Sequence, residues 1–192
     1  ISACLVGSEM CIRDRYYPIN VDLSGVIEMQ TDILIQSFLD GVYDERLLDV
    51  YADETKIYYQ RERYINAIKK FEQCYKPGDV EIFSAPGRTE ICGNHTDHQN
   101  GEVLAASVNL DTIGIVKKTD DNVIRLVSDN YDEIIIRLDD VSVKEKEKET
   151  TKALIKGVVS GFLERKYAVG GFQAYITSDA VSYTHLRAHE TG

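Results

Sequence analysis

Residues 84–101 read SAPGRTEICGNHTDHQNG, a polar stretch that glycines interrupt at several positions. Strand-like runs flank it on both sides, since residues 80–84 read VEIFS and residues 102–108 read EVLAASV. A polar connection between two strands is a typical place for a binding or catalytic site, because the strands hold it rigidly. We therefore expect this connection to carry the chemistry of the protein.

The side chains of this connection favour recognition of a polyol. Arg88 offers a planar set of donors that suits an oxyanion or a carboxylate. Asp97, when ionised, only accepts hydrogen bonds, so it can bind two neighbouring hydroxyl groups of a sugar. Asn94 and His95 each donate and accept hydrogen bonds. The glycines add to this, because a backbone without a Cβ can approach a ligand closely.

Other interpretations of the same residues remain open. Arg88 could instead pair with a nearby carboxylate, and His95 and His98 could be exposed turn residues. His95, Asp97 and His98 could also bind a metal ion. Because the other two of the four histidines lie after residue 180, such a site would need distant carboxylates as further ligands. We therefore expect no metal site.

Apolar residues at helical spacing predict helices before this segment. A stripe with a period of 3.6 residues predicts a helix over 54–75, which Pro77-Gly78 ends. A shorter helical patch over 26–39 is expected to end at Gly41.

A further helix is predicted after the segment, over 153–166, with Thr150 or Thr151 as its cap. One face of it carries Leu154, Gly157, Val158, Gly161 and Phe162. Glycines lower helix propensity, so we expect another element to pack closely against this face.

Short runs of Val, Ile and Ala predict the strands of a sheet. They are expected over 80–84, 102–108, 112–117, 123–128, 133–138 and 172–177. A tight turn is expected at Ala85-Pro86-Gly87 and a hairpin turn at Asp120-Asp121-Asn122. Strands with helices before and after them indicate the α+β class, with a mixed β-sheet and packed helices. Neither G-x-G-x-x-G nor G-x-x-x-x-G-K-[ST] occurs, so the usual phosphate-binding loops are not predicted.

The composition argues against several classes of function. The 192 residues include 22 Lys and Arg against 32 Asp and Glu, which gives a net charge of −10. An acidic chain without clustered basic residues argues against nucleic-acid binding. No apolar run reaches the roughly 20 residues of a membrane span, and no signal peptide is recognisable. We therefore expect a cytoplasmic protein with no membrane partner, whose four cysteines are free thiols.

Residues 85–97, APGRTEICGNHTD, closely resemble the galactokinase signature, approximately G-R-x-N-x-[LI]-G-E-H-T-D. Galactokinases belong to the superfamily of galactokinase, homoserine, mevalonate and phosphomevalonate (GHMP) kinases. The resemblance extends from about Val80 to Asp179. Two positions depart from the signature, since Glu90 stands where the family has Asn, and Asn94 where it has Glu. Asn94 keeps an acceptor for a sugar hydroxyl but removes a charge, which leaves the preferred sugar less strictly defined.

The resemblance assigns roles to six residues. They are Arg88, which would stabilise charge at the reacting sugar oxygen; Asn94, His95, Thr96 and Asp97, which would bind the sugar; and Ser128, which would lie near the nucleotide. The implied reaction is phosphoryl transfer from ATP–Mg²⁺ to the anomeric hydroxyl of galactose, giving galactose 1-phosphate, by positioning and charge neutralisation. The implied cofactors are ATP and Mg²⁺, and the implied partners are galactose and ATP.

The two ends of the chain differ from its middle. Residues 1–15 and 181–192 resemble translated sequencing-adapter ends, the alternative being that they are real termini. We expect 16–79 to be a helical N-terminal extension and 80–180 to be a truncated galactose-binding, N-terminal domain of a GHMP-type kinase. The phosphate-binding helix start and the catalytic aspartate of the family would follow residue 180, so we expect this 192-residue chain to be inactive by itself.

Three other functions stay open at this level. The protein could be a galactokinase-like sugar sensor that regulates a partner, or a related kinase that acts on an amino sugar such as galactosamine. It could also be an unrelated α+β binding module, if the similarity to the signature is coincidental.

Overall fold

The computed structural model describes residues 4–5, 21–22, 25–26, 29–92, 102, 104–129 and 131–179. The helices are α1 (Thr31–Leu39), α2 (Asp44–Tyr51), α3 (Ile57–Cys74) and α4 (Thr151–Glu164), with short 3-10 turns η1 (Glu54–Lys56) and η3 (Glu145–Glu147). The strands are β1 (Cys4–Leu5), β2 (Val21–Asp22), β3 (Gly25–Val26), β4 (Met29–Gln30), β5 (Asp79–Cys92), β6 (Leu104–Thr119), β7 (Val123–Ser128), β8 (Ile134–Arg137) and β9 (Gly171–Ser178).

One mixed sheet organises the molecule. Its strands follow the spatial order β4-β5-β6-β9-β7-β8, and β1 also pairs with β6. The pairs β5–β6, β6–β9 and β7–β8 are antiparallel, whereas β7 and β9 are parallel. Strands β2 and β3 form a separate two-stranded sheet. The predicted α+β class with a mixed sheet is thereby confirmed.

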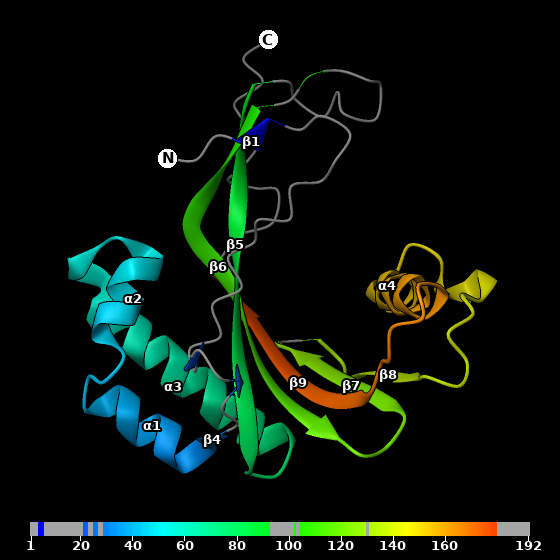
Figure 1. Ribbon diagram of the computed structural model, residues 1–192, viewed down its shortest axis with the longest axis horizontal. Coiled ribbons are helices and arrows are strands. Elements are labelled where there is room, and N and C mark those ends of the chain that lie inside the picture. Colours follow the sequence, from blue (N-terminus) through cyan, green and yellow to red (C-terminus); the bar gives the residue numbers. More distant parts are fainter. Residues whose placement is uncertain are drawn as a thin grey trace.

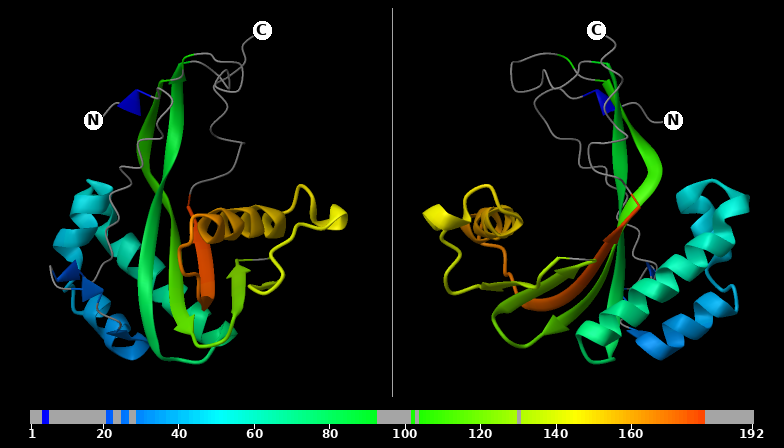
Figure 2. Two further views of the ribbon diagram at one scale, coloured as in Figure 1. Left: turned by 45° about the vertical axis from the view of Figure 1, so that its right-hand side comes forward. Right: turned by 180° about the vertical axis from the view of Figure 1, so that it is seen from behind.

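Helices cover both faces of this sheet, with α1–α3 on one side and α4 on the other (Figure 1, Figure 2). Successive side chains of a strand point to opposite faces. On β9, Tyr175 therefore joins the core under α1–α3, while Phe172 packs with the core under α4. The larger core includes Leu34, Phe38, Tyr64, Ile68, Phe71, Val80, Ile82, Ile113 and Ile115. The smaller core contains Ile124, Ile136 and Val159.

Helix α3 is the main contact of the helical layer with the sheet. It matches the helix predicted over 54–75, since η1 and α3 together span 54–74. Its predicted apolar stripe is buried, with Tyr64, Ile65, Ile68 and Phe71 each at most 3% exposed. This stripe shares the larger core with β5 and β6, so α1–α3 and the sheet pack as one unit. The division of the chain at residues 79 and 80 stays a prediction.

Two predictions about β5 and β6 are wrong. Ala85-Pro86-Gly87 forms no tight turn, because β5 continues through it to Cys92. Residues 102–108 and 112–117 are not separate strands either, since β6 runs unbroken from Leu104 to Thr119. Pro86 pairs with Asp111 but Arg88 pairs with Ser107, so the register shifts here. Proline lacks an N–H, and an irregularity in the ladder accommodates it without ending the strand.

The predicted hairpin at 120–122 is also wrong. The chain does turn there, but β6 and β7 are not neighbours, because β9 lies between them and pairs with both. The last of the described strands thus enters the middle of the sheet, a long-range pairing that local patterns do not encode.

The face of α4 that was expected to be covered is open. Thr150 caps the helix as predicted, accepting a hydrogen bond from the backbone N–H of Ala153. The buried residues of the helix are Lys156 and Val159, whereas Leu154 is 69% exposed. Nothing lies within 4 Å of a Cβ built on Gly157. The expected packing partner is therefore absent from the described part of the chain.

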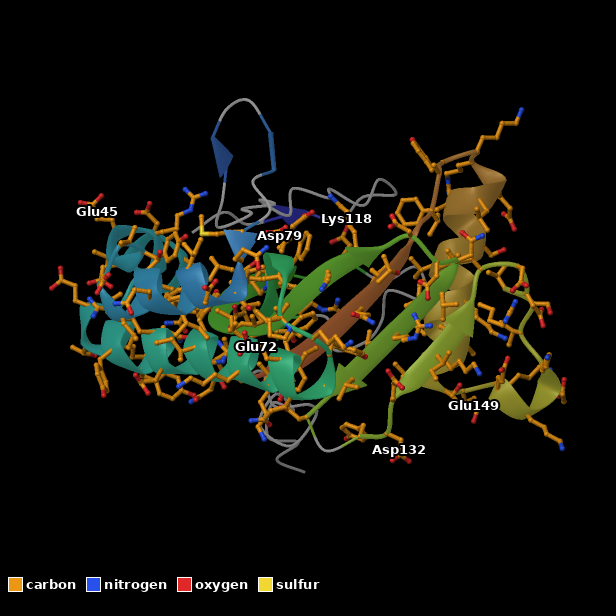
Figure 3. The ribbon with its side chains drawn as sticks, turned by 90° about the horizontal axis from the view of Figure 1, so that it is seen from below. Glu45, Glu72, Asp79, Lys118, Asp132 and Glu149 are labelled. Carbon is orange, nitrogen blue, oxygen red and sulfur yellow. The ribbon has the colours of Figure 1, made fainter. Side chains whose placement is uncertain are left out.

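Hydrogen bonds connect the start of α1 to α3 and to β5. The Thr31 hydroxyl donates to the carboxylate of Glu72 on α3, and the Gln30 amide donates to Asp79 on β5 at 2.9 Å. Figure 3 shows Glu72 on α3 and Asp79 and Lys118 near the adjoining end of the sheet.

Among the helices described, none is both long and apolar enough to cross a membrane. Cys74 and Cys92 are free thiols.

Candidate functional site

The pairing of β5 with β6 positions Arg88. Its backbone lies opposite Ser107, directly after the register shift at Pro86, in the part of the β5–β6 pair that projects beyond β9 (Figure 1). The Arg88 side chain is exposed. A guanidinium in this position is accessible to a ligand.

The other residues assigned to the sugar lie in the connection between these two strands. Cys92 at the end of β5 pairs with Leu104 at the start of β6, so residues 93–103 join the tips of the pair. Asn94, His95, Thr96 and Asp97 belong to this connection and lie outside the described residues. Their roles stay predictions, as does the role of Arg88.

Ser128 lies in another part of the sheet. It is the last residue of β7, half-buried, and pairs with Ile176 of β9. Ile176 in turn pairs with Gly114 of β6, seven residues from the Ser107 partner of Arg88, a separation of roughly 23 Å along the strand. The structure therefore does not bring Arg88 and Ser128 together, and the nucleotide role of Ser128 stays a prediction.

The sequence analysis missed a buried polar cluster centred on Arg63 of α3. One guanidinium nitrogen donates to the Asp111 carboxylate, and a second donates to the backbone carbonyl of Asp111 at 2.9 Å. The third, Nε, lies 3.2 Å from the Asp179 carboxylate. The backbone N–H of Asp179 also donates to the Asp111 carbonyl at 3.0 Å. Arg63 thereby links α3 to β6 and to the residue after β9.

Hydroxyl groups complete the shell around Asp111. Tyr51 donates to its carboxylate at 2.8 Å and lies 3.0 Å from the Tyr64 hydroxyl, and Ser84 also donates to the carboxylate. Burial, with the nearby charge of Asp111, raises the pKa of Tyr64 to about 12. Burial, together with the neighbouring Tyr64 and Asp111, raises the pKa of Tyr51 even further above its ordinary value. Both phenols therefore stay protonated and act as donors.

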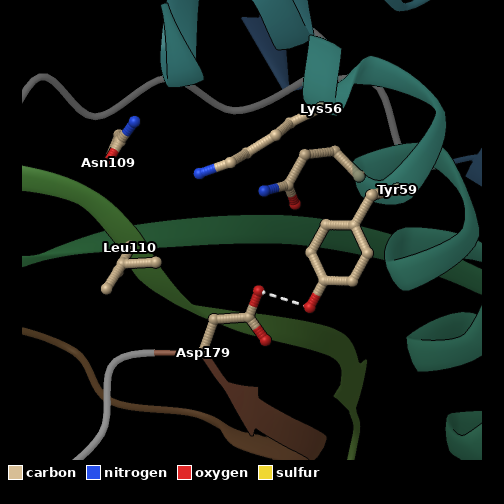
Figure 4. Close-up of a pocket in the computed structure, with 6 residues that line it drawn as sticks. Lys56, Tyr59, Asn109, Leu110 and Asp179 are labelled. Atoms are coloured by element: carbon tan, nitrogen blue, oxygen red, sulfur yellow. Dashed lines mark hydrogen bonds between the residues drawn. The ribbon is translucent and has the colours of Figure 1, made fainter. Parts of the chain in front are cut away.

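Two cavities adjoin the Arg63 cluster. The larger, about 420 Å³, is lined by Lys56, Tyr59, Gln60, Asn109, Leu110 and Asp179. Figure 4 shows Tyr59 and Asp179 pointing toward one another across it, with the Tyr59 hydroxyl donating to the carboxylate at 2.9 Å. The second, about 370 Å³, lies between α3 and the ends of β7 and β9, beside Asn66, Lys70, Asp129 and Thr177. Neither cavity is lined by Arg88 or by Ser128.

The polar cluster does not fit a magnesium ion. Its two acidic side chains, Asp111 and Asp179, are both paired with the guanidinium of Arg63. Within the ranges given above, no group of three or more His, Cys, Asp or Glu side chains is placed to hold a metal. The cluster is therefore a structural link, and no chemical step is assigned to it.

A signal for this cluster is present in the sequence. Gln60 and Arg63 lie on the buried face of α3, where the apolar stripe leads one to expect hydrophobic side chains. Asp111 similarly interrupts the apolar residues of β6. Long polar side chains on a buried face require partners, so each of these exceptions indicates a buried polar partner without identifying it.

Comparison with known proteins finds similarity to galactokinases. The model of the galactokinase galactose-binding signature matches residues 69–118, which include the end of α3, β5, the connection and most of β6. The chain is 33% identical over 117 residues to a galactokinase of Clostridium tetani, covering 60% of this chain and 29% of that protein. It is 32% identical over 123 residues to a galactokinase of Lactobacillus helveticus, covering 62% of this chain and 31% of that protein.

A solved structure agrees with these relatives. The Lactococcus lactis galactokinase complexed with galactose superimposes with a TM-score of 0.53 at 29% identity, covering 62% of this chain and 32% of that one. The chain spans about a third of the length of the curated relatives it matches. It therefore matches the galactokinase galactose-binding signature, and its fold is similar to part of the Lactococcus lactis galactokinase.

Proposed function

We propose that this chain is part of a galactokinase, which transfers a phosphoryl group from ATP to the anomeric hydroxyl of galactose and forms galactose 1-phosphate. The observation that carries the proposal is the match of residues 69–118 to the galactose-binding signature. The similarity to the Lactococcus lactis galactokinase, solved with galactose, supports galactose as the sugar. ATP is a cytoplasmic phosphoryl donor, so we place the protein in the cytoplasm.

In this proposal the residues of the connection bind the sugar. Asn94, His95, Thr96 and Asp97 supply donors and acceptors that suit neighbouring sugar hydroxyls. Arg88 precedes them on β5, and its exposed guanidinium supplies positive charge for the reacting sugar oxygen. Phosphoryl transfer depends mainly on such positioning and charge stabilisation. Mg²⁺ and ATP are the proposed cofactors, with Ser128 as a contact on the nucleotide side.

An amino sugar is the second candidate substrate, because Asn94 stands where the family signature has Glu and the preferred sugar is therefore less strictly defined. An amide lacks the negative charge that attracts an ammonium group, so Asn94→Glu should raise the turnover of galactosamine relative to that of galactose. In the chimera described in the next paragraph, turnover of galactosamine should be compared with that of galactose before and after Asn94→Glu. Equal or better turnover of galactosamine by the unchanged sequence would favour the amino-sugar kinase.

The proposal can be tested in a chimera in which this chain, up to Asp179, replaces the matching segment of the Lactococcus lactis galactokinase. We expect ATP-dependent formation of galactose 1-phosphate. Arg88→Lys should lower kcat by about 10²–10³-fold, because loss of a donor to developing charge has effects of this size. Arg125→Lys is the matched control, since Arg125 lies on β7 and pairs with Asp121 at 2.7 Å.

The outcomes separate the alternatives. A folded chimera that binds galactose but forms no phosphorylated product would favour a sugar sensor and contradict the kinase. Equal losses of kcat in Arg88→Lys and Arg125→Lys would show that Arg88 has no special role. A chimera that binds no sugar would remove the basis of the proposal.

A further inference from the structure

Helix α4 presents an apolar row to solvent. Leu154, Val158 and Phe162 follow one another at intervals of four residues and are 69%, 54% and 49% exposed. The ring of Tyr167 extends the row, lying 5.9 Å from the ring of Phe162 and 60% exposed. Single exposed apolar residues are ordinary, but a contiguous row of large ones is typical of an interaction surface.

The described fold does not use this row. The helix packs on β7 and β8 through a neighbouring face, where Val159 and Ile155 join the smaller core. Lys156 on that face is 3% exposed and donates to Glu147 at 2.7 Å and to the Ser142 carbonyl at 2.9 Å. These contacts fix the helix without any contribution from the outward row.

Two glycines lie beside the row, one helical turn apart. A Cβ on Gly157 would meet nothing within 4 Å, and one on Gly161 would meet only the end of the flexible Arg165 side chain at 3.4 Å. Each glycine costs the helix stability, and nothing in the described chain requires either. Residues without a side chain let a second helix approach closely, because the distance between packed helices depends on the side chains at the contact.

The length of a relative is the basis for inferring an occupant of this face. About two thirds of the solved Lactococcus lactis galactokinase has no counterpart in this chain, since the match covers 32% of that structure. A surface that is apolar, backed by a rigid helix and unused by the described residues suits a permanent intramolecular contact. A second copy of the chain is the competing occupant.

We propose that the outward face of α4, formed by Leu154, Gly157, Val158, Gly161 and Phe162, docks an apolar helix from the remaining part of a galactokinase polypeptide. This inference rests on the proposed function. It assigns to the two glycines the role of admitting a closely packed helix.

In this chain without the rest of a galactokinase, substitutions on the outward face of α4 should have the effects expected of an exposed surface. Gly157→Ala should raise its midpoint of thermal unfolding by roughly 2–4 °C, because alanine favours the helix and meets no neighbour. Val158→Lys should change the midpoint little, as should the matched control Val42→Lys, whose side chain is also exposed at 67%. A large loss in Val158→Lys alone would show that the face is already covered, which overturns the proposal.

The chimera described above distinguishes the occupants. We expect Val158→Lys to lower its unfolding midpoint by more than roughly 5 °C, while Val42→Lys again has little effect, because only the first lysine would be buried. Similar small shifts in both variants would overturn the proposal. So would a concentration-dependent dimer of the chain, measured by analytical ultracentrifugation, that Val158→Lys abolishes, since the occupant would then be a second copy.

Two further readouts keep the result interpretable. If the chimera does not fold, the complementary Lactococcus lactis fragment added in trans should protect the amides of residues 154–162 from hydrogen exchange, and absence of protection overturns the proposal. Galactose phosphorylation by the unchanged chimera tests the proposed function separately. An active chimera that tolerates Val158→Lys refutes only the docking, whereas an inactive one that is destabilised by it refutes only the kinase.

Discussion

Arg63 of α3 and Asp111 of β6 form a buried ion pair that joins the helical layer to the middle of the sheet. Their side chains are 7% and 3% exposed. The same guanidinium lies 3.2 Å from Asp179, which follows β9. The Arg63 side chain therefore connects helix α3, strand β6 and the residue that follows β9. Without this pairing, Arg63 and Asp111 would each be a buried, unpaired charge, which is costly.

Arg63→Met should destabilise the chain by about 3–5 kcal/mol, because it leaves the Asp111 carboxylate buried with only hydroxyl donors. Unfolding in urea, followed by circular dichroism, measures the change. The exposed pair of Arg125 and Asp121 provides the control, and Arg125→Met should cost no more than about 1 kcal/mol. Equal losses in the two variants would show that burial of the Arg63 pair has no energetic consequence.

Tyr64 should resist titration in the folded protein. Its pKa is raised from 10.0 to about 12 by burial first and by the charge of Asp111 second. A raised pKa means that the folded state holds the proton more tightly, so this stability is complete below pH 10 and is lost as the pH rises toward 12. Absorbance at the phenolate band should therefore show at least one late-titrating tyrosine among the twelve.

The assignment can be checked by substitution. Tyr64→Phe should remove one late-titrating group and weaken the fall in stability between pH 10 and pH 12. Tyr58→Phe is the control, because Tyr58 is 73% exposed on the same helix. A late titration that persists unchanged in Tyr64→Phe would contradict the assignment.

Glu147 should contribute stability that disappears in acid. Its pKa is lowered from 4.5 to about 2, first by the hydrogen bond from Lys156 and then by the backbone N–H of Lys144. A lowered pKa stabilises the fold above pH 4.5, and this contribution is lost as the pH falls toward 2. The difference in urea midpoint between the unchanged chain and Glu147→Gln should therefore be largest above pH 5 and should shrink toward pH 2. A difference that does not vary over this range would contradict the pairing.

Local sequence patterns correctly predicted α3, the cap region of α4 and strand β7. The stripe of Tyr64, Ile65, Ile68 and Phe71 predicted α3, and the cap of α4 was narrowed to Thr150 or Thr151, of which Thr150 forms it. Strand β7 matches its predicted range of 123–128. In each case the residues that decide the element lie within a few positions of one another.

The wrong predictions depend on distant partners. Pro86-Gly87 resembles a turn when taken alone, but pairing with β6 across a register shift keeps the strand continuous. The position of β9 between β6 and β7 depends on contacts of residues more than forty positions apart. The candidate site follows the same rule, since the signature identified Arg88 from contiguous residues, whereas Arg63 and Asp111 meet only after folding.

Gly171 should prove essential at the point where β9 enters the sheet. A Cβ at this position would lie 1.9 Å from the backbone carbonyl oxygen of Asp121, in the turn after β6. Backbone cannot move aside as a flexible side chain can, so Gly171→Ala should cost about 1–3 kcal/mol or more. The adjacent Gly170 is the matched control, because a Cβ there would meet nothing within 4 Å. Gly170→Ala should leave the urea midpoint nearly unchanged or raise it slightly, since alanine restricts the unfolded chain. Equal effects of the two substitutions would show that β9 does not pass closely beside the 120–122 turn, and the insertion of β9 between β6 and β7 would then need to be revised.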